Sequence, residues 1–183
     1  MPDGPVFLTG FMGAGKSRVG RLLAESLDRE FVDTDQLVEA RVGRSIAEIF
    51  AASGEAHFRQ LEHECVAEAA GRGQVVVALG GGAITHERNW DLIRAAKGVV
   101  VCLEADLGTI LDRVNRKETR PLLAGLSVDE KRDKIGRMLA EREPFYRRAD
   151  VWVRTTDTQT PAFTAQQVSE ALEQWSAEHP SRS

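Results

Sequence analysis

Short hydrophobic runs alternate along this chain with longer segments in which hydrophobic residues recur at helical spacing. Buried strands are predicted at residues 5–9, 31–32, 74–79, 99–103 and 151–153. Helices are predicted at residues 16–27, 45–70 (interrupted at Gly54), 107–114, 129–148 and 162–175, and a further helix is predicted to follow residue 35 and to run through residue 40. Strands that alternate with helices predict an α/β fold. We expect a three-layer sandwich whose central, mostly parallel five-stranded sheet is covered on both faces.

Length and composition fit one domain of this kind. The 183 residues, 42% hydrophobic and 28% charged, suffice to bury most of a sheet and exclude disorder. We assign residues 1–176 to the domain and expect the polar tail at 177–183 to fray. The longest hydrophobic run, 98–103, is far short of the ~20 residues of a spanning helix, and no signal segment precedes the first strand. The sequence therefore predicts a cytoplasmic protein without a membrane partner.

The charge distribution favours a small anionic ligand. The net charge of −4 gives no global basic field, so we expect no nucleic-acid partner. Arginines nevertheless cluster in one third of the chain, at positions 113, 116, 120, 137, 142, 147 and 148. The two cysteines, Cys65 and Cys102, lack metal-type spacing and are expected to be buried, reduced thiols. Because no exposed hydrophobic helix stripe stands out, we expect a monomer.

The segment Gly10-Phe-Met-Gly-Ala-Gly-Lys-Ser17 matches G-x-x-x-x-G-K-[ST] between a predicted strand and a predicted helix. Glycines in such a loop let consecutive N–H groups point at phosphate oxygens, and the start of the helix adds its positive dipole end. Lys16 can reach the β- and γ-phosphates of a nucleotide, and the Ser17 hydroxyl can ligate Mg²⁺. The spacing therefore predicts a P-loop that binds ATP with Mg²⁺.

A P-loop alone does not separate kinases from GTPase switches or transport ATPases. GTPases need a base-reading Asn-Lys-x-Asp, and the nearest string here, at residues 115–118, fails at its second and fourth places. Oligomeric ATPases usually end an apolar strand in paired acids, whereas the third predicted strand here ends in Gly80-Gly81-Gly82. These differences favour a kinase.

Two carboxylates follow the second predicted strand, in Asp33-Thr34-Asp35. In extended backbone, residues i and i+2 point to the same side, so both acids could face the crevice at the carboxyl edge of the sheet. One could hold Mg²⁺ through water while the other takes the proton of an attacking hydroxyl. Acids in this position also occur simply as helix N-caps, and this alternative remains open.

In these motifs and several others, the chain resembles the shikimate kinases over about residues 5–172. The resemblance rests on separated segments: the phosphate loop, the acid pair, Gly54-Glu-Ala-His-Phe-Arg-Gln-Leu-Glu62, Leu79-Gly-Gly-Gly82, Thr119-Arg-Pro-Leu-Leu123 and Glu141-Arg-Glu-Pro-Phe-Tyr146. The family has the P-loop nucleoside-monophosphate-kinase-like fold. It transfers phosphate from ATP to the 3-hydroxyl of shikimate, on the route to chorismate and the aromatic amino acids.

The resemblance implies a role for each matching residue. Nucleotide contacts would come from Gly13, Ala14, Gly15, Lys16, Ser17, Arg18, Arg113, Arg120 and Gln159. The Arg18 side chain, where the family often has threonine, is expected to point away from the phosphates. Shikimate would be held by Asp35, Arg59, Gly80, Gly81, Gly82 and Arg142. Asp35 would help to activate the hydroxyl, with Lys16 and Arg120 also catalytic, and Ser17 and Asp33 would support Mg²⁺.

Two regions of the domain follow from these assignments, a substrate-binding region at 33–62 and a lid at 113–126. The polar composition of the lid suits a segment that closes over the phosphates with Arg120 and excludes water.

Several alternatives stay open at the level of sequence. Arg59 could merely pair with Glu55 or Glu62 on a helix surface, and Arg142 with Glu141 or Glu143. The glycine triplet could allow close approach of a ligand to bare N–H groups, or form a plain tight turn. The protein could instead be a gluconate kinase-like enzyme, or a nucleotide-binding regulatory module without an acceptor.

Overall fold

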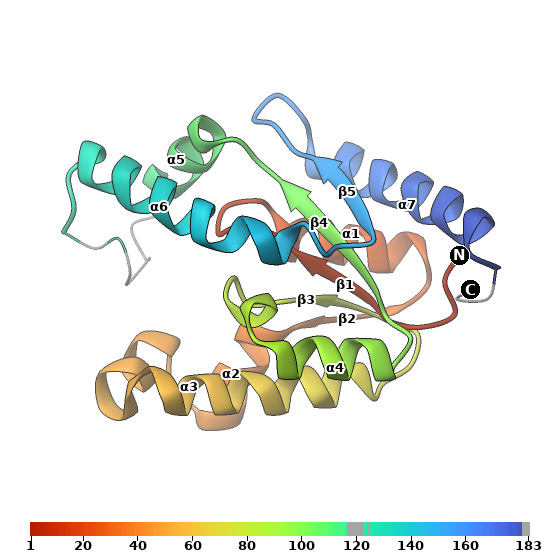
Figure 1. The fold of residues 1–183 in the computed structure, drawn as a ribbon, viewed down its shortest axis with the longest axis horizontal. Helices are drawn as coiled ribbons and strands as arrows, with labels where there is room; N and C mark the ends of the chain where they lie inside the picture. Colours follow the sequence, from red (N-terminus) through yellow and green to blue (C-terminus); the bar gives the residue numbers. More distant parts are fainter. Residues whose placement is uncertain (117–122, 124, 181–183) are drawn as a thin grey trace.

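The computed structural model of the chain describes residues 1–116, 123 and 125–180. Its centre is a five-stranded sheet, seen in Figure 1. The strands are β1 (Val6–Thr9), β2 (Glu30–Asp33), β3 (Val75–Ala78), β4 (Val99–Glu104) and β5 (Val151–Arg154). All pairings are parallel, in the order β2-β3-β1-β4-β5, so the carboxyl ends of the strands share one edge.

Helices cover both faces of the sheet because successive residues of each buried strand point to opposite sides. On one face, Val6 and Leu8 of β1 belong to the hydrophobic cluster packed by α1 (Lys16–Ser26) and α7 (Pro161–Glu178). On the other face, Phe7 belongs to the cluster packed by α3 (Ile46–Ala70) and α4 (Glu87–Ala95). The prediction of a three-layer α/β sandwich is confirmed.

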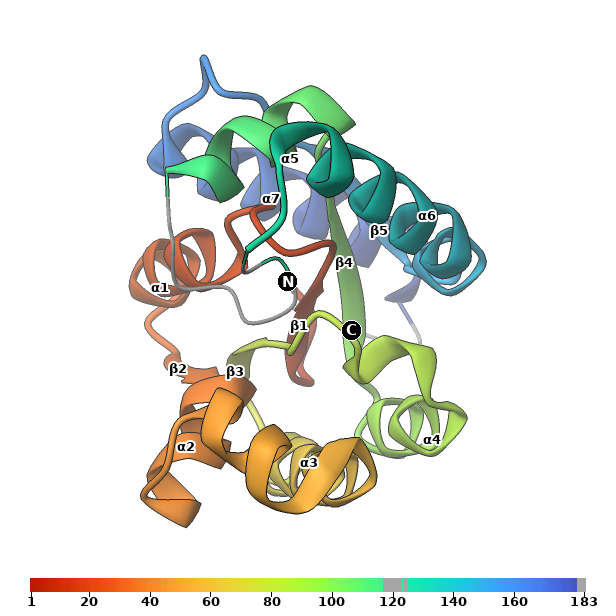
Figure 2. The same ribbon diagram turned by 90° about the vertical axis from the view of Figure 1, so that its left-hand side faces the viewer.

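The remaining helices stand around the carboxyl ends of the strands. They are α2 (Thr34–Val42), the short 3-10 turn η1 (Ala83–Thr85), α5 (Leu107–Asn115) and α6 (Val128–Tyr146). Figure 2 looks onto this end of the sheet, with α2 and α3 on one side and α5 and α6 on the other. The connections that carry the sequence motifs therefore meet between these two pairs of helices.

The main difference from the sequence-based prediction lies between residues 83 and 95, where η1 and α4 were not expected. Only Trp90, Ile93 and the half-buried Leu92 give α4 its hydrophobic side, too few to produce a clear helical period. The expected interruption of α3 is present, since Gly54 has φ 76° and ψ 176° inside it. In the described ranges, no helix is both long enough and apolar enough to span a membrane.

Candidate active site

The phosphate loop lies between β1 and α1, as its sequence context requires. Gly10, Gly13 and Gly15 have φ values of 133°, 87° and 97°, which only glycine adopts freely. Gly15 stands directly before α1, and its carbonyl accepts from the amides of Arg18 and Val19 at 3.0 and 2.9 Å. The loop thus turns so that it leads into the positive end of the helix dipole, an arrangement suited to phosphate.

The two polar side chains of the loop are fixed by different partners. Lys16 Nζ donates to the carbonyl oxygens of Gly10 and Phe11, at 2.8 and 3.3 Å, so its ammonium group lies over the loop. Ser17 Oγ donates to Asp33 Oδ2 at 2.6 Å. Asp33, at the end of β2, also accepts from the amides of Asp35 and Gln36 with Oδ1. One carboxylate therefore both caps α2 and touches the phosphate loop, so the N-cap interpretation applies to Asp33.

Asp35 lies in the first turn of α2, not in the extended backbone that we expected, because Asp33 already acts as the N-cap. The side-by-side arrangement of the two acids therefore arises from a helical turn rather than from strand alternation. Burial raises the pKa of Asp35, the nearby Asp33 carboxylate raises it further, and Lys16 and Arg59 act in the opposite direction. A carboxylate with a raised pKa is a better proton acceptor than an exposed one.

The glycine triplet after β3 is explained by side chains that approach it closely. A Cβ at Gly80 would lie 2.5 Å from Asp35 Oδ1 and 2.7 Å from Glu62 Oε1, and one at Gly82 would lie 2.6 Å from Arg59 Nη1. Gly82 has φ −107°, and none of the three glycines is among the described residues with positive φ. Gly80 and Gly82 are thus required for close approach, not for a left-handed turn.

Arg59 is held on α3 by both glutamates that the sequence offered as partners. Nε and Nη2 donate to Glu55 Oε1 at 3.2 and 3.0 Å, and Nη1 donates to Glu62 Oε2 at 2.9 Å. Glu62 is no surface residue, since its side chain is 1% exposed. Burial raises the pKa of Glu62, against the opposing effect of Arg59. The alternative of a simple surface pair is therefore wrong for Glu62.

Arg142, on α6, faces the same glycine triplet from the opposite side. Its Nη1 donates to the Gly81 carbonyl at 3.0 Å, and its guanidinium lies 5.5 Å from the centre of the Phe11 ring. Glu143, a partner that the sequence left open, pairs instead with Arg147. Arg142 is thus placed between the phosphate loop and the triplet.

Arg113, on α5, ties the phosphate loop to the segment after β5. Its guanidinium nitrogens donate to Asp157 Oδ1 (2.8 Å), to the Gly13 carbonyl (3.0 Å), to Thr155 Oγ1 (3.0 Å) and to the Thr156 carbonyl (2.7 Å). Gln159 stands in the same segment, with Oε1 accepting from the Thr156 amide at 3.1 Å. These two residues are therefore neighbours beside the loop.

One cavity of about 800 Å³ joins most of these groups. Of the residues assigned from sequence, its lining includes Gly13, Ala14, Gly15, Lys16, Ser17, Arg18, Asp33, Asp35, Gly81, Arg113 and Gln159. Gly80, Gly82, Arg59 and Arg142 do not line it but adjoin it through the contacts at the triplet. Arg120 lies outside the described residues.

Three residues that support the site were not assigned to it from sequence. Glu62 fixes Arg59, and Tyr146 donates to the Gly81 carbonyl at 3.5 Å. Thr34 Oγ1 accepts from the Gly80 amide at 2.9 Å and donates to the Ala78 carbonyl at 3.3 Å, which joins the start of α2 to the end of β3. The signal that could have revealed Glu62 was its place three residues after Arg59, at the end of the segment 54–62.

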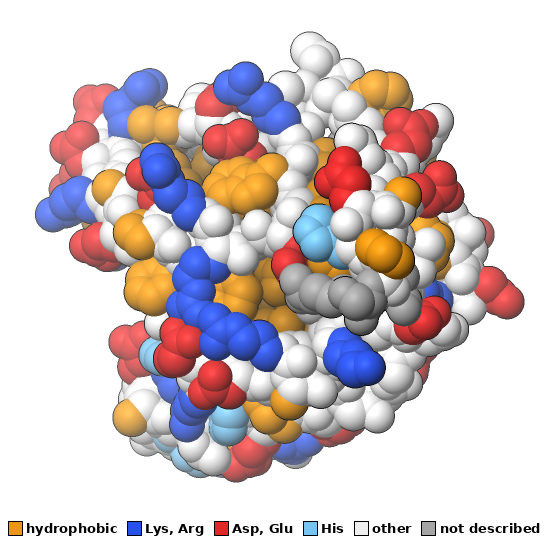
Figure 3. All heavy atoms as spheres, turned by 45° about the vertical axis from the view of Figure 1, so that its right-hand side comes forward, with side chains coloured by type: hydrophobic (Ala, Val, Ile, Leu, Met, Phe, Trp, Pro, Cys, Tyr) orange, Lys and Arg blue, Asp and Glu red, His pale blue; other side chains and the backbone are white. Residues whose placement is uncertain are grey.

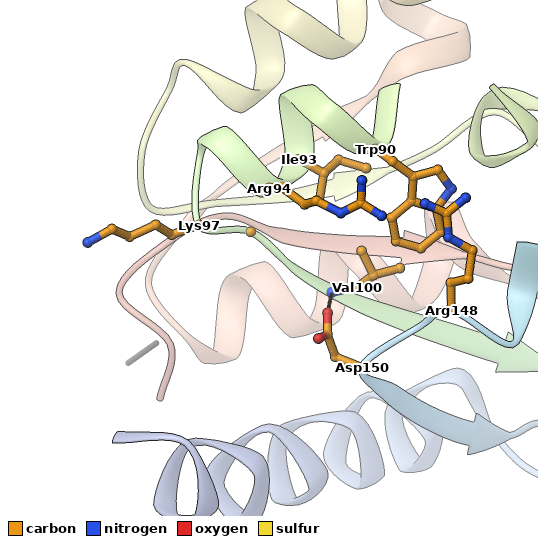
Figure 4. A pocket seen from close by; sticks show the side chains of 8 residues that line it. Trp90, Ile93, Arg94, Lys97, Val100, Arg148 and Asp150 are labelled. Carbon is orange, nitrogen blue, oxygen red and sulfur yellow. Dashed lines mark hydrogen bonds between the residues drawn. The ribbon is translucent and has the colours of Figure 1, made fainter. Parts of the chain in front are cut away.

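A second cavity, of about 420 Å³, lies away from the phosphate loop, between α4 and the amino ends of β4 and β5. Figure 4 shows Arg148 over the Trp90 ring, at 4.2 Å from its centre, and Lys97 pointing away from both. Glu87 accepts from Arg148 and from Arg94, and these hydrogen bonds lower its pKa to about 2.

On the face shown in Figure 3, basic and acidic side chains are interspersed, so the electrostatic potential over that face is not dominated by one sign of charge.

An open parallel sheet with a phosphate loop after its first strand, and with acids and arginines gathered at its carboxyl edge, defines a P-loop kinase with a small acceptor. Comparison with known families narrows this class, because the profile described as "Shikimate kinase" matches residues 12–173. The chain belongs to the shikimate kinase family, as the sequence motifs predicted.

Individual relatives agree with this assignment. A shikimate kinase of Chlorobium chlorochromatii (strain CaD3) is 43% identical over 175 residues, which cover 93% of this chain and 91% of that protein. The solved structure of shikimate kinase from Acinetobacter baumannii in complex with shikimate is 35% identical, with a TM-score of 0.85 and coverage of 93% of each chain. A gluconokinase from Sinorhizobium meliloti 1021 has a TM-score of 0.56 over 97% of this chain and 98% of its own, at 16% identity, which shows a shared fold alone.

Proposed function

We propose that this protein transfers the γ-phosphate of ATP to the 3-hydroxyl of shikimate and releases shikimate 3-phosphate and ADP. The observation that carries the proposal is the placement of Asp35. This carboxylate lines the cavity of the phosphate loop and also packs over Gly80, beside the two glycines that Arg142 and Arg59 approach. Phosphate transfer to a hydroxy acid needs a proton acceptor between the phosphate loop and groups that bind a carboxylate, such as two arginines.

The nucleotide would occupy the larger cavity. The loop amides and Lys16 would hold its phosphates, as the position of the Lys16 ammonium over the loop supports. Arg113 lines this cavity with its guanidinium fixed by hydrogen bonds through its nitrogens, and that planar group would stack on the purine ring. Gln159, in the same segment, would lie beside the base.

The residues at the loop also fit Mg²⁺. A hydroxyl and a carboxylate, those of Ser17 and Asp33, lie within 2.6 Å of each other, and oxygen donors of this kind suit the ion. Within the described residues, no three His, Cys, Asp or Glu side chains come together as a metal cluster. The site therefore suits an ion that takes its other ligands from phosphate and water. When bound, Mg²⁺ would neutralise charge on the phosphates.

The acceptor would lie on the glycine triplet. Arg59 and Arg142 would grip its carboxylate, since planar guanidinium groups match a carboxylate in two-point contact. Gly80, Gly81 and Gly82 would form the floor, and the backbone of Gly81 would contact a ring hydroxyl. The complex of the Acinetobacter baumannii relative with shikimate supports this choice of acceptor.

In the chemical step, the acceptor hydroxyl oxygen forms a bond to the γ-phosphorus, and the bond from that phosphorus to the β,γ-bridging oxygen breaks. The hydroxyl proton passes to Asp35, and the leaving oxygen departs with ADP. Lys16, at the β- and γ-phosphates, would stabilise the charge that develops there. The raised pKa of Asp35 favours its acceptance of the proton.

Several sequence-based assignments extend this proposal. A lid at 113–126, with Arg120 over the phosphates, would exclude water from the site. A substrate-binding region at 33–62, a single domain at 1–176, a monomeric state and a cytoplasmic location remain predictions from sequence, as do the frayed tail at 177–183 and the absence of nucleic-acid and membrane partners.

A coupled ADP-release assay tests the function. We expect ATP consumption to depend on shikimate and to exceed that with gluconate by at least about 10²-fold in kcat/KM, because only the hydroxy acid of matching shape places its hydroxyl at Asp35. Preference for gluconate would support the gluconate kinase alternative. ATP consumption that ignores every acceptor would support a regulatory nucleotide-binding module.

A further inference from the structure

The guanidinium of Arg59 has three edges, and each one faces a protein group. Glu55 Oε1 accepts from Nε and Nη2, which form one of the two edges with two donors, and Glu62 Oε2 accepts from Nη1. At the remaining edge, a Cβ on Gly82 would lie 2.6 Å from Nη1, 2.7 Å from Nη2 and 2.9 Å from Cζ. Because this Cβ would lie closer to the two Nη atoms than to Cζ, Gly82 crowds the edge that they form. A ligand carboxylate therefore has no two-point edge of Arg59 to itself.

The two glutamates differ in how firmly they are held. The Glu62 side chain is 1% exposed, whereas the Glu55 side chain is 66% exposed. Glu55 directly follows Gly54, where α3 is interrupted, and a Cβ at Gly54 would meet nothing within 4 Å. Glu55 can thus turn into water without leaving a buried charge, while Glu62 cannot.

We infer that Glu55 is a built-in competitor of the acceptor carboxylate for Arg59, an inference that rests on the proposed function. The acceptor exchanges one carboxylate for another at the Nε and Nη2 edge, while Glu62 keeps the arginine in place. The contribution of Arg59 to the free energy of acceptor binding is then only the difference between its ion pair with the acceptor and its ion pair with Glu55. An acceptor without a charged carboxylate leaves Glu55 where it is, so Glu55 lowers affinity for the acid alone.

The experiment compares Glu55→Gln with Glu64→Gln. Both variants remove one negative charge from an exposed side chain of α3, and Glu64 pairs with Arg41, away from the site. KM for shikimate at saturating ATP and Kd for shikimate from calorimetry are measured for both and for the parent protein. The neutral methyl ester of shikimate is titrated in parallel, and thermal unfolding verifies the fold of each variant.

We expect Glu55→Gln to lower both KM and Kd for shikimate about two- to five-fold, the range set by an exposed ion pair. Kd for the methyl ester and all values for Glu64→Gln should match the parent within about 1.5-fold. An unchanged or higher Kd for shikimate in Glu55→Gln overturns the inference, because the contact is then neutral or positions Arg59. An equal gain for the ester also overturns it, because the effect is then one of net charge.

The proposed function can fail independently of this inference. The proposed function fails if ADP release by the parent protein does not increase when shikimate is added. The competition between Glu55 and the acceptor carboxylate is measured by the Kd of shikimate in calorimetry, which does not depend on turnover. Glu55→Ala provides a second reading, because it removes the residual acceptor oxygen of glutamine, and its Kd should fall at least as far as that of Glu55→Gln.

Discussion

Replacing Gly80 by alanine tests whether Asp35 must stand where the structure places it. The new Cβ would lie 2.5 Å from Asp35 Oδ1 and 2.7 Å from Glu62 Oε1, whereas ordinary contact begins near 3.4 Å. Asp35 would have to move by about 0.9 Å, because close-packed surroundings leave the main chain little room to yield. Glu62 gives no relief, since it is buried and held by Arg59.

A misplacement of about 1 Å at a reacting group costs on the order of 10²-fold in rate, which is about 2.7 kcal/mol of transition-state stabilisation. We therefore expect Gly80→Ala to lower kcat about 10²-fold. KM for ATP should change less than about twofold, because the phosphate loop is untouched. The coupled ADP-release assay at saturating ATP and shikimate measures kcat. Denaturant unfolding measures the free energy of unfolding, which overpacking at Gly80→Ala should lower by about 1–3 kcal/mol.

Two other glycines provide matched controls. At Gly136, in α6, a Cβ meets nothing within 4 Å, so Gly136→Ala should keep full activity. At Gly81 the nearest atom, Arg142 Nη1, would be at 3.5 Å, so Gly81→Ala should lose less activity than Gly80→Ala. If folded Gly80→Ala retained kcat within about threefold of Gly136→Ala, the claim that Gly80 sets the position of Asp35 would be refuted.

The remaining predictions concern the two arms of the site and its proton acceptor. Lys16→Met should lower kcat by about 10²–10³-fold through loss of charge at the β- and γ-phosphates, and near-normal turnover would refute that role. Arg59→Lys keeps the charge but loses the paired N–H donors of the guanidinium, so KM for shikimate should rise about tenfold. An unchanged KM would show that Arg59 does not contact the acceptor. Asp35→Asn should lower kcat about 10²–10⁴-fold while calorimetry shows ATP affinity intact. Because burial raises the pKa of Asp35, its contribution to stability is complete below the pKa of the unfolded chain and is lost as pH rises through the folded value. Asp35→Asn should therefore unfold at a higher temperature than the parent at pH 7 but not near pH 3, and an equal melting temperature at pH 7 would contradict this.

The central sheet and most helices could be predicted because their hydrophobic residues are many and periodic. β3 and the first five residues of β4 are valine-rich hydrophobic runs that are buried throughout, as expected in a sheet covered on both faces. Helix α4 escaped prediction because it buries few large side chains, among them Trp90 and Ile93, against its neighbours. Its position depends on tertiary contacts such as Trp90 Nε1 to the Ile84 carbonyl at 2.8 Å, which no local pattern encodes.

The phosphate loop could be predicted in detail because its chemistry depends on residues that are adjacent in sequence. The way in which Arg59 is held could not, since it depends on the burial of its partner. A glutamate three residues after an arginine looks the same on an exposed helix and on a buried one, yet Glu62 is 1% exposed. The prediction for Asp35 failed in geometry but not in placement, because an N-cap at Asp33 starts the helix earlier than an extended pair would allow.

The double use of Asp33 links the two halves of the site. Its Oδ1 caps α2, whose first turn carries Asp35, and its Oδ2 accepts from Ser17 of the phosphate loop. An N-cap contributes about 0.5–2 kcal/mol to a helix, so the carboxylate cannot turn fully toward a metal ion without loosening the turn that carries Asp35. Only Oδ2 is available to change partners while Oδ1 stays on the helix. The position of Asp35 is therefore set by the same side chain that meets the nucleotide end of the cavity, and neither half of the site is built independently of the other.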